Sequence, residues 1–203
     1  MLKINHSFFL FFFFFFNFAI FFANPTLYAS DENSIQLTLP SEFSLNTCSV
    51  RPWIGKTAKW GGVTDERTEK AVGQQSKSGE ILSQVNVNPP LEQVFDISLK
   101  QLFTSCGIQW TNDDQAPEIH IAITEFFAGS DKKLFTGKGQ AQSRLRLEIG
   151  RQHMTLHTLE VGFSIENKGL RKAKLKQLQS TLNELLAETL RQIPKLNQLG
   201  QAL

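Results

Sequence analysis

Cys48 and Cys106 are the residues of this chain best suited to a defined covalent chemistry. A thiolate acts as a nucleophile when a neighbouring base activates it, and no His lies near either cysteine in the sequence. Outside the cytoplasm, where the surroundings are oxidising, two cysteines pair more often than they stay free. We therefore expect a Cys48–Cys106 disulfide, with two buried free thiols or a nucleophilic thiol as the alternatives.

Two aromatic residues, Trp53 and Trp60, stand in a segment that also carries Lys and Gly. Their rings could stack on a sugar or another ring ligand, but such residues more often close over the edge of a core. In the same segment, Gly55-Lys56-Thr57 resembles the end of a phosphate-binding loop. Val50 stands where that loop requires a glycine, so we expect no nucleotide site.

Catalytic and metal-binding signatures are missing from the sequence. There is no G-x-S-x-G, H-E-x-x-H or C-x-x-C motif, and the acidic residues near Asp65 are typical of a solvated loop. We therefore expect no catalytic residue, no metal site and no cofactor. The net charge of +2 also gives no reason to expect nucleic acid as a partner.

Basic residues gather in two places. Arg144 and Arg146 alternate with apolar residues in a strand-like stretch, and Lys172 and Lys176 lie near the start of the last helical segment. If the two groups adjoin, they form a patch suited to an acidic partner or to weak contact with anionic headgroups. The alternative is an ordinary solvated surface.

The elements that would position these residues begin with the segment Pro89–Gly107. Its apolar residues recur every three or four positions, which predicts an amphipathic helix ended by Gly107. Leu170–Ile193 shows the same period and is followed by Pro194, so it predicts a second helix.

Alternating apolar and polar residues predict strands at Ile81–Val87, Glu118–Phe126, Thr136–Ile149 and Met154–Ile165. In the last of these the apolar phase shifts by one residue, which indicates a β-bulge near Thr158. The order of elements favours an α+β fold, with an antiparallel sheet of about four to five strands and two amphipathic helices packed on one face. Val63–Glu80 is expected to be mainly a surface loop or lid.

The chain is expected to begin with a secretory signal peptide at residues 1–29. Lys3 precedes the run Phe8–Phe22, which is too short for an ordinary membrane-spanning helix, although an uncleaved anchor is the alternative. Residues 30–62 are then an N-terminal extension with the Trp-bearing segment, and residues 63–203 are a single α+β domain. We expect an exported protein, periplasmic or secreted to the medium.

In this order of elements, the chain resembles the YajG-type family of bacterial envelope lipoproteins and, more distantly, transport-auxiliary lipoproteins of the PqiC type. The residues that carry the resemblance are Val63-Thr64-Asp65-Glu66-Arg67, Val72-Gly73, Leu102 with Cys106-Gly107-Ile108, Glu118–Thr124 and Leu182-Asn183-Glu184-Leu185-Leu186. The resemblance covers about residues 60–193 and implies an α+β envelope domain without catalytic residues. This chain differs by lacking a lipid-accepting Cys after the signal, and by its Trp-bearing segment and two internal cysteines.

Together these observations favour an exported, non-catalytic binding or adaptor module that contacts a protein or envelope component. The expected contact surfaces are the loop Thr64–Gly79, which holds Asp65 and Arg67, and the outer sheet face with Arg144 and Arg146. The alternatives are a secreted effector or enzyme of unknown chemistry, or a glycan- or lipid-binding protein that uses Trp53 and Trp60. The partner and the oligomeric state are not specified by the sequence.

Overall fold

The computed structural model describes residues 33–39, 48, 53–77, 80–130, 139–152, 154–167 and 174–203. The expected signal peptide at residues 1–29 and the candidate contact Lys172 lie outside the described residues.

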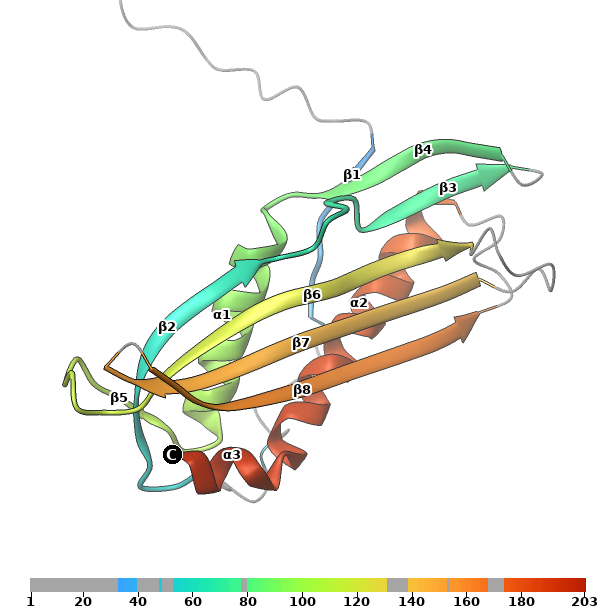
Figure 1. Cartoon of the computed structure of the whole chain (residues 1–203). Coiled ribbons are helices and arrows are strands. Elements are labelled where there is room, and N and C mark those ends of the chain that lie inside the picture. Colours follow the sequence, from blue (N-terminus) through green and yellow to red (C-terminus); the bar gives the residue numbers. More distant parts are fainter. Residues whose placement is uncertain are drawn as a thin grey trace, which may run out of the picture. The chain divides into compact units, whose positions relative to one another are not determined.

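Among the described residues, eight strands form one mixed sheet (Figure 1). They are β1 (Ser34–Ile35), β2 (Thr57–Asp65), β3 (Gly73–Lys77), β4 (Glu80–Val87), β5 (Gln109–Trp110), β6 (Glu118–Ser130), β7 (Gly139–Arg151) and β8 (Met154–Asn167). The order is β1-β4-β3-β6-β2-β5, with β7 added to β6 and β8 added to β7.

The expected antiparallel sheet of four to five strands is therefore too small and of the wrong type. Only the pairs β3–β4, β6–β7 and β7–β8 are antiparallel, while β1–β4, β2–β5, β2–β6 and β3–β6 are parallel. The main omissions were β2, most of which lies in the expected N-terminal extension, and β3, which lies within the segment Val63–Glu80 that was expected to be mainly a surface loop. In the structure the expected boundary between residues 62 and 63 falls inside the nine-residue strand β2.

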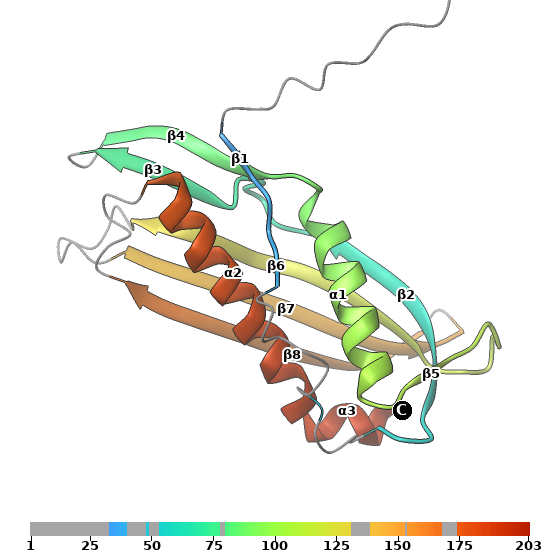
Figure 2. The same ribbon diagram turned by 180° about the vertical axis from the view of Figure 1, so that it is seen from behind.

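The helices α1 (Leu91–Ser105) and α2 (Leu175–Gln192) lie on the same face of the sheet, as expected (Figure 2). A 3-10 turn at Ile193–Lys195 and the short helix α3 (Asn197–Ala202) follow α2. The core lies between the helices and the sheet. It contains the apolar stripe of each long helix and the inward row of each central strand.

Strands β6, β7 and β8 show how alternation sets the two faces. On β7, Ala141, Leu145 and Leu147 are fully buried, whereas Arg144 between them is exposed. The expected bulge in β8 is present, because Thr155 pairs with Gly150 while His157 pairs with Ile149. It lies at Leu156, within two residues of the expected position.

One polar pair sits inside the core. The hydroxyl of Thr189 on α2 donates to the carbonyl oxygen of Leu185 at 2.7 Å, so the hydroxyl of Ser143 on β7 donates to the oxygen of Thr189. Ser143 and Thr189 are 3% and 0% exposed, and this bond fixes α2 on the sheet.

Residues 33–39 form a strap that crosses the helix layer between α1 and α2 (Figure 2). The side chains of Ile35 and Leu37, two residues of the strap, are buried in the core. Gln179 of α2 donates to the carbonyl oxygen of Gln36 at 2.7 Å, and the backbone N–H of Thr38 donates to Asn183 at 3.0 Å.

The expected disulfide Cys48–Cys106 is present. It ties the chain after the strap to the end of α1, with Cα atoms 5.1 Å apart. Gly107 follows at φ +106, and a Cβ there would lie 2.8 Å from the backbone of Ile54. The predicted helix terminator therefore also lets the Trp53–Ile54 backbone approach the helix end.

Candidate functional site

The candidate site is built on an interruption in one edge of β6. β2 runs parallel to β6 as far as the pair Asp65–Ile123, and β3 resumes at the pair Gly73–Ala128. Between them residues 66–72 leave the sheet as a loop, which we call the Arg67 loop. The carbonyl oxygen of Phe126 lies in the gap on β6 and needs a donor from elsewhere.

Arg67 supplies that donor. Its Nη1 donates to the carbonyl oxygens of Phe126 at 2.8 Å and Ala71 at 3.2 Å. Its Nη2 donates to the carbonyl oxygen of Lys70 at 2.9 Å and to Asp65 Oδ2 at 2.9 Å, and its Nε donates to Asp65 Oδ1 at 3.0 Å. All five N–H groups of the guanidinium are thus used, so Arg67 holds the loop rather than a ligand.

Asp65 is the fixed anion of this arrangement, with only 8% of its side chain exposed. Burial alone would raise its pKa. The hydrogen bonds from the Arg67 side chain and backbone, helped by the charges of Arg67 and Lys70, more than offset burial and lower the pKa below its usual value. Asp65 is therefore ionised at neutral pH and engaged through both oxygens, which is unsuited to a general base.

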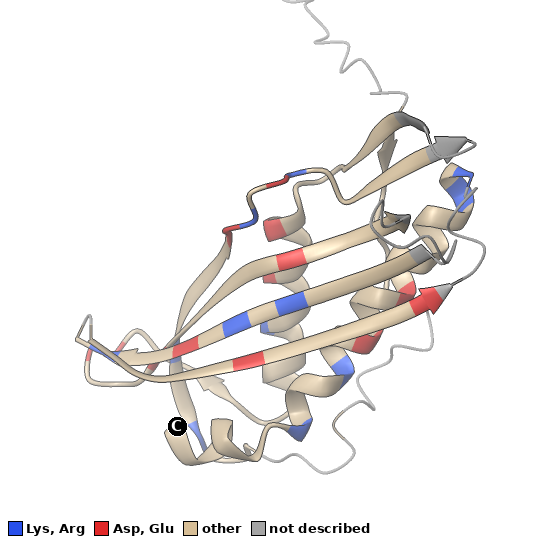
Figure 3. Cartoon of the chain, turned by 45° about the vertical axis from the view of Figure 1, so that its right-hand side comes forward, with Lys and Arg blue, Asp and Glu red and all other residues tan. Residues whose placement is uncertain are grey.

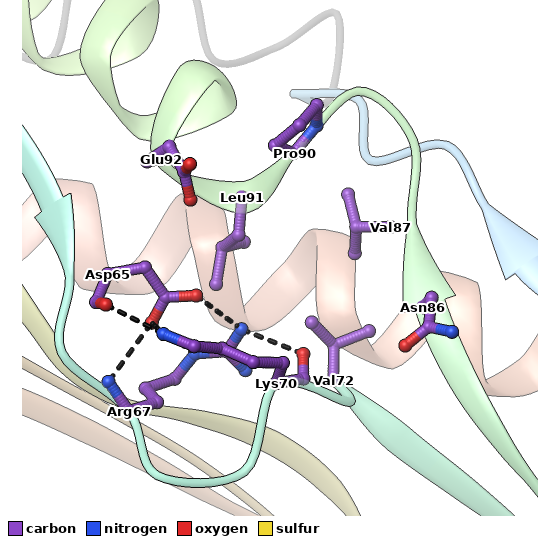
Figure 4. A pocket seen from close by; sticks show the side chains of 9 residues that line it. All are labelled: Asp65, Arg67, Lys70, Val72, Asn86, Val87, Pro90, Leu91 and Glu92. Atoms are coloured by element: carbon purple, nitrogen blue, oxygen red, sulfur yellow. Dashed lines mark hydrogen bonds and ion pairs between the residues drawn. The ribbon is translucent and has the colours of Figure 1, made fainter.

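On one side of the Arg67 loop lies a cleft of about 410 Å³, which we call the inner cleft (Figure 4). Its floor is apolar, from Val72, Val87 and Leu91, and its rim carries charges of both signs. Figure 4 shows the Lys70 side chain over Asp65, where its Nζ donates to the Asp65 carbonyl oxygen at 2.7 Å. Asp65 pairs with Arg67 and Lys70, and with Glu92 the lining holds two anions and two cations, so the inner cleft carries no net charge to attract a ligand.

On the other side of the loop lies a second cleft, the outer cleft, of about 370 Å³. The loop contributes Thr68 and Glu69 to its walls, and the sheet contributes Glu125, Phe127 and Arg144. Arg144 keeps 58% of its side chain exposed and lies 4.0 Å from Glu125. The outer cleft therefore joins the Arg67 loop to the outward face of the sheet.

An ion-pair network makes that junction firm. Arg146 Nη2 donates to both carboxylate oxygens of Glu66, at 2.9 and 2.7 Å, and Arg146 Nε donates to Glu148 at 2.8 Å. Hydrogen bonds from Arg146 to Glu148 and Glu66 raise the pKa of Arg146. The two contact surfaces expected from the sequence, the loop and the sheet face, thus form one continuous surface. We call it the outer surface: the Arg67 loop with the outward rows of β6, β7 and β8.

Lys176 does not belong to this surface. It is exposed on α2, in the helix layer, whereas Arg144 and Arg146 point from the opposite face of the sheet. The condition for a shared basic patch is therefore not met by these three residues. Figure 3 shows acidic and basic residues interspersed along β6–β8 rather than a field of one sign.

The two candidate tryptophans lie in an aromatic cluster. Trp53 is 2% exposed and packs on Phe103 with ring centroids 5.4 Å apart. Trp60 is partly buried, contacts Phe103 and Trp110, and donates its indole N–H to Asp96 at 2.9 Å. Trp53 thus presents no open ring face, and Trp60 is held by its polar edge.

Comparison of the sequence with models of known protein families identifies the family of this chain. The model of a family described as uncharacterized lipoprotein matches residues 62–203. The chain belongs to this family. No curated protein matches the chain.

Two solved structures are similar to this lipoprotein-family chain. Protein XCC0632 from Xanthomonas campestris, of family DUF330, has a TM-score of 0.53 at 12% identity, over 83% of this chain and 96% of its own. It supports the fold alone. A candidate lipoprotein from Caulobacter crescentus CB15 has a TM-score of 0.35 at 11% identity, over 68% of this chain and 88% of its own.

Membership of the lipoprotein family makes the chain an exported, envelope-associated protein. Both cysteines of this sequence are joined in the disulfide. Among the described residues no helix is long and apolar enough to cross a membrane. No group of three or more His, Cys, Asp or Glu within those ranges could hold a metal ion.

Sequence reasoning placed Asp65 and Arg67 among the candidate contacts but missed what they do together. It also missed Glu66 and Glu125 as the partners of Arg146 and Arg144. The spacing Asp-x-Arg at the end of a strand was the available signal, since such a pair can close a tight turn. The distance of 80 positions between Glu66 and Arg146 left no local signal.

Proposed function

We propose that the protein is a non-catalytic adaptor module of the bacterial envelope that contacts a protein partner through the outer surface. The observation that carries the proposal is the Arg146–Glu66 ion pair, in which Nη2 of Arg146 donates to both carboxylate oxygens and joins the Arg67 loop to the face of β6–β8. No described helix or strand covers that face, whereas both long helices cover the other.

The rigidity of the loop supports a binding role. A surface loop normally loses conformational freedom when a partner binds, and that loss weakens association. Here Arg67 has already ordered the loop through Asp65 and three carbonyl oxygens. A partner would therefore meet a preorganised surface.

The mixed charge supports a protein partner. Interspersed carboxylates and guanidinium groups select a partner by complementary charges and fix its orientation. The weak contact with anionic headgroups expected from the sequence remains a separate prediction, which flotation with vesicles of anionic lipid would test. Assignment to the YajG type in particular, and a free periplasmic or secreted form, are further parts of this proposal.

Photo-crosslinking in the cells that export the protein tests the outer surface. A photoreactive amino acid is placed at Thr158 or Ser164, exposed outward positions of β8. Matched control positions are Gln177 and Ser180, which are exposed on α2. We expect the outward positions to yield one common adduct and the α2 positions to yield none.

A charge variant sharpens the result. Glu66→Lys would place a cation beside Arg146 and reverse the charge where the loop meets the sheet face, and should abolish the common adduct. Lys174→Glu, a charge reversal at an exposed position before α2, is the control and should preserve it. Adducts from the α2 positions alone, or an adduct indifferent to Glu66→Lys, would reject the outer surface as the contact.

A further inference from the structure

β8 is a long strand with an open edge. It spans Met154–Asn167 and pairs only with β7, and no other described strand pairs with it. Alternate N–H and C=O groups along its free side therefore lack a strand partner within the described part of the chain. β8 contains no Pro, Lys or Arg, the residues that commonly protect such an edge from a further strand.

The two faces of the open edge differ in polarity. On the helix side, Leu159, Phe163 and Ile165 pack against the core but remain only partly buried. Since a neighbouring strand would cover them, they mark a row that favours apolar residues in an added strand. On the outward side, Thr158, Glu160 and Ser164 are exposed.

The charge on the outward side favours a basic occupant. Strands β6, β7 and β8 together carry five Glu against three Arg. Arg146 is held by Glu66 and Glu148, and Arg144 lies beside Glu125. Glu160 is exposed and makes no hydrogen bond or ion pair with a described side chain. The strand that ends the sheet therefore presents carboxylate and no cation.

We propose that the free edge of β8 binds an extended segment of the partner protein, in which apolar residues alternate with Lys or Arg. The segment adds to the sheet as a ninth strand, with apolar side chains beside Phe163 and Ile165 and a basic side chain beside Glu160. This inference rests on the proposed adaptor role and names the kind of segment that the partner presents.

The probe is a synthetic peptide of about nine residues, an ordinary strand length, in which Lys and Val alternate. Its binding to the purified exported chain is measured by fluorescence anisotropy, beside a control peptide in which Glu replaces Lys. We expect the Lys peptide to bind and the Glu peptide not to bind. Two further peptides carry N-methyl groups on all Lys amides or on all Val amides. Because the residues of one phase point their amides to the same side of a strand, only one of these peptides should lose binding.

Variants of the protein locate the site. Glu160→Gln should weaken binding about two- to fivefold, the range of one exposed ion pair. Glu184→Gln removes the same charge from the exposed face of α2 and should leave binding unchanged. Equal tolerance of both N-methylated peptides, or equal effects of the two Gln variants, would overturn strand addition at β8.

Sedimentation of the chain without peptide tests the rival occupant. A dimer that Phe163→Lys dissociates would show that a second copy fills the edge, and would overturn the proposal. The outcome is separable from the adaptor proposal. Peptide binding with no adduct from Thr158 or Ser164 would reject the adaptor role alone. An adduct from these positions, together with peptide binding that neither Glu160→Gln nor either pattern of N-methylation weakens, would reject only the edge.

Discussion

Arg67 donates from Nε and Nη2 to the two carboxylate oxygens of Asp65, at 3.0 and 2.9 Å, at the point where β2 leaves the sheet. The two side chains are 5% and 8% exposed. A buried ion pair of this kind stabilises only when its remaining hydrogen-bonding groups are satisfied. The three carbonyl oxygens bound by Arg67 meet that requirement, so a sheet interruption that would cost stability becomes a defined loop.

Replacing Arg67 should therefore be severe. Arg67→Met keeps the length of the side chain but leaves Asp65 as a buried charge whose remaining counter-ion is the mostly exposed Lys70, and we expect a loss of about 3 kcal/mol in the free energy of unfolding. Urea denaturation followed by Trp fluorescence measures it. Lys70→Met is the matched control, because 62% of that side chain is exposed, and it should change the free energy by less than about 1 kcal/mol. Equal losses in the two variants would contradict the structural role of Arg67.

The pKa of Asp65 predicts a pH dependence with a definite sign. Its pKa in the folded protein lies below the ordinary value of 3.8, so the folded state binds the proton less tightly than the unfolded state. The stabilisation is therefore complete above the unfolded-state value and is lost as pH falls through the folded-state pKa. The difference in unfolding free energy between wild type and Asp65→Asn should shrink as pH falls below about 4. A difference that stays constant down to pH 2 would contradict this assignment.

The Ser143–Thr189 bond predicts strong coupling between two residues 46 positions apart. Thr189→Val removes this bond and leaves the Ser143 hydroxyl only its 3.5 Å contact with the carbonyl oxygen of Phe163, so it should cost about 1 kcal/mol. Ser143→Ala combined with Thr189→Val removes both polar groups, so the double variant should lose less than the sum of the single variants. A double-mutant cycle from urea denaturation measures the coupling, and additive losses would show that the hydroxyl groups act independently.

Reduction of Cys48–Cys106 should lower stability without abolishing the fold. The bond joins residues 58 positions apart, and chain entropy gives it about 4 kcal/mol at most. Denaturation of the exported chain with and without reductant measures the difference. Thiol titration under denaturing conditions should find no reactive thiol before reduction and two afterwards. Two reactive thiols in the unreduced protein would contradict the bridge.

The elements predicted well are those whose pattern is local. Both long helices and β6, β7 and β8 were found close to their expected ranges, because amphipathic periods of 3.6 and 2 residues are written in the sequence itself. The helix expected to begin at Leu170 begins at Leu175, because the backbone of Lys174 before it is extended and forms the N-cap.

The strand β2 was not predicted, and the reason is physical. Its sequence TAKWGGVTD does not alternate cleanly, and its register shifts between Trp60 and Gly62. Gly62 has φ +87, a conformation that glycine adopts without strain, so the residue that appeared to break a strand instead forms a bulge within it. The strand pairs in parallel with β6, more than 50 positions later, and no local pattern encodes such pairing.

The candidate site was predicted residue by residue but not as an arrangement. Sequence reasoning selected Asp65, Arg67, Arg144 and Arg146 by their charge and position. It could not foresee that the Arg67 side chain would turn inward and replace a missing backbone donor. The unpaired carbonyl oxygen of Phe126 arises only because β2 and β3 pair with the same edge of β6 and leave a gap between them. Trp53 is 2% exposed, which agrees with the expectation that such residues more often close over the edge of a core.

The strap at residues 33–39 also bears on the timing of folding. Its contact between Thr38 and Asn183 joins residues 145 positions apart, near the two ends of the folded unit. Contacts of such separation require most of the chain to be present before they can form. During synthesis the helix layer must stay open until α2 has emerged. A chain that closes so late stays unfolded for longer after synthesis, which suits an exported protein.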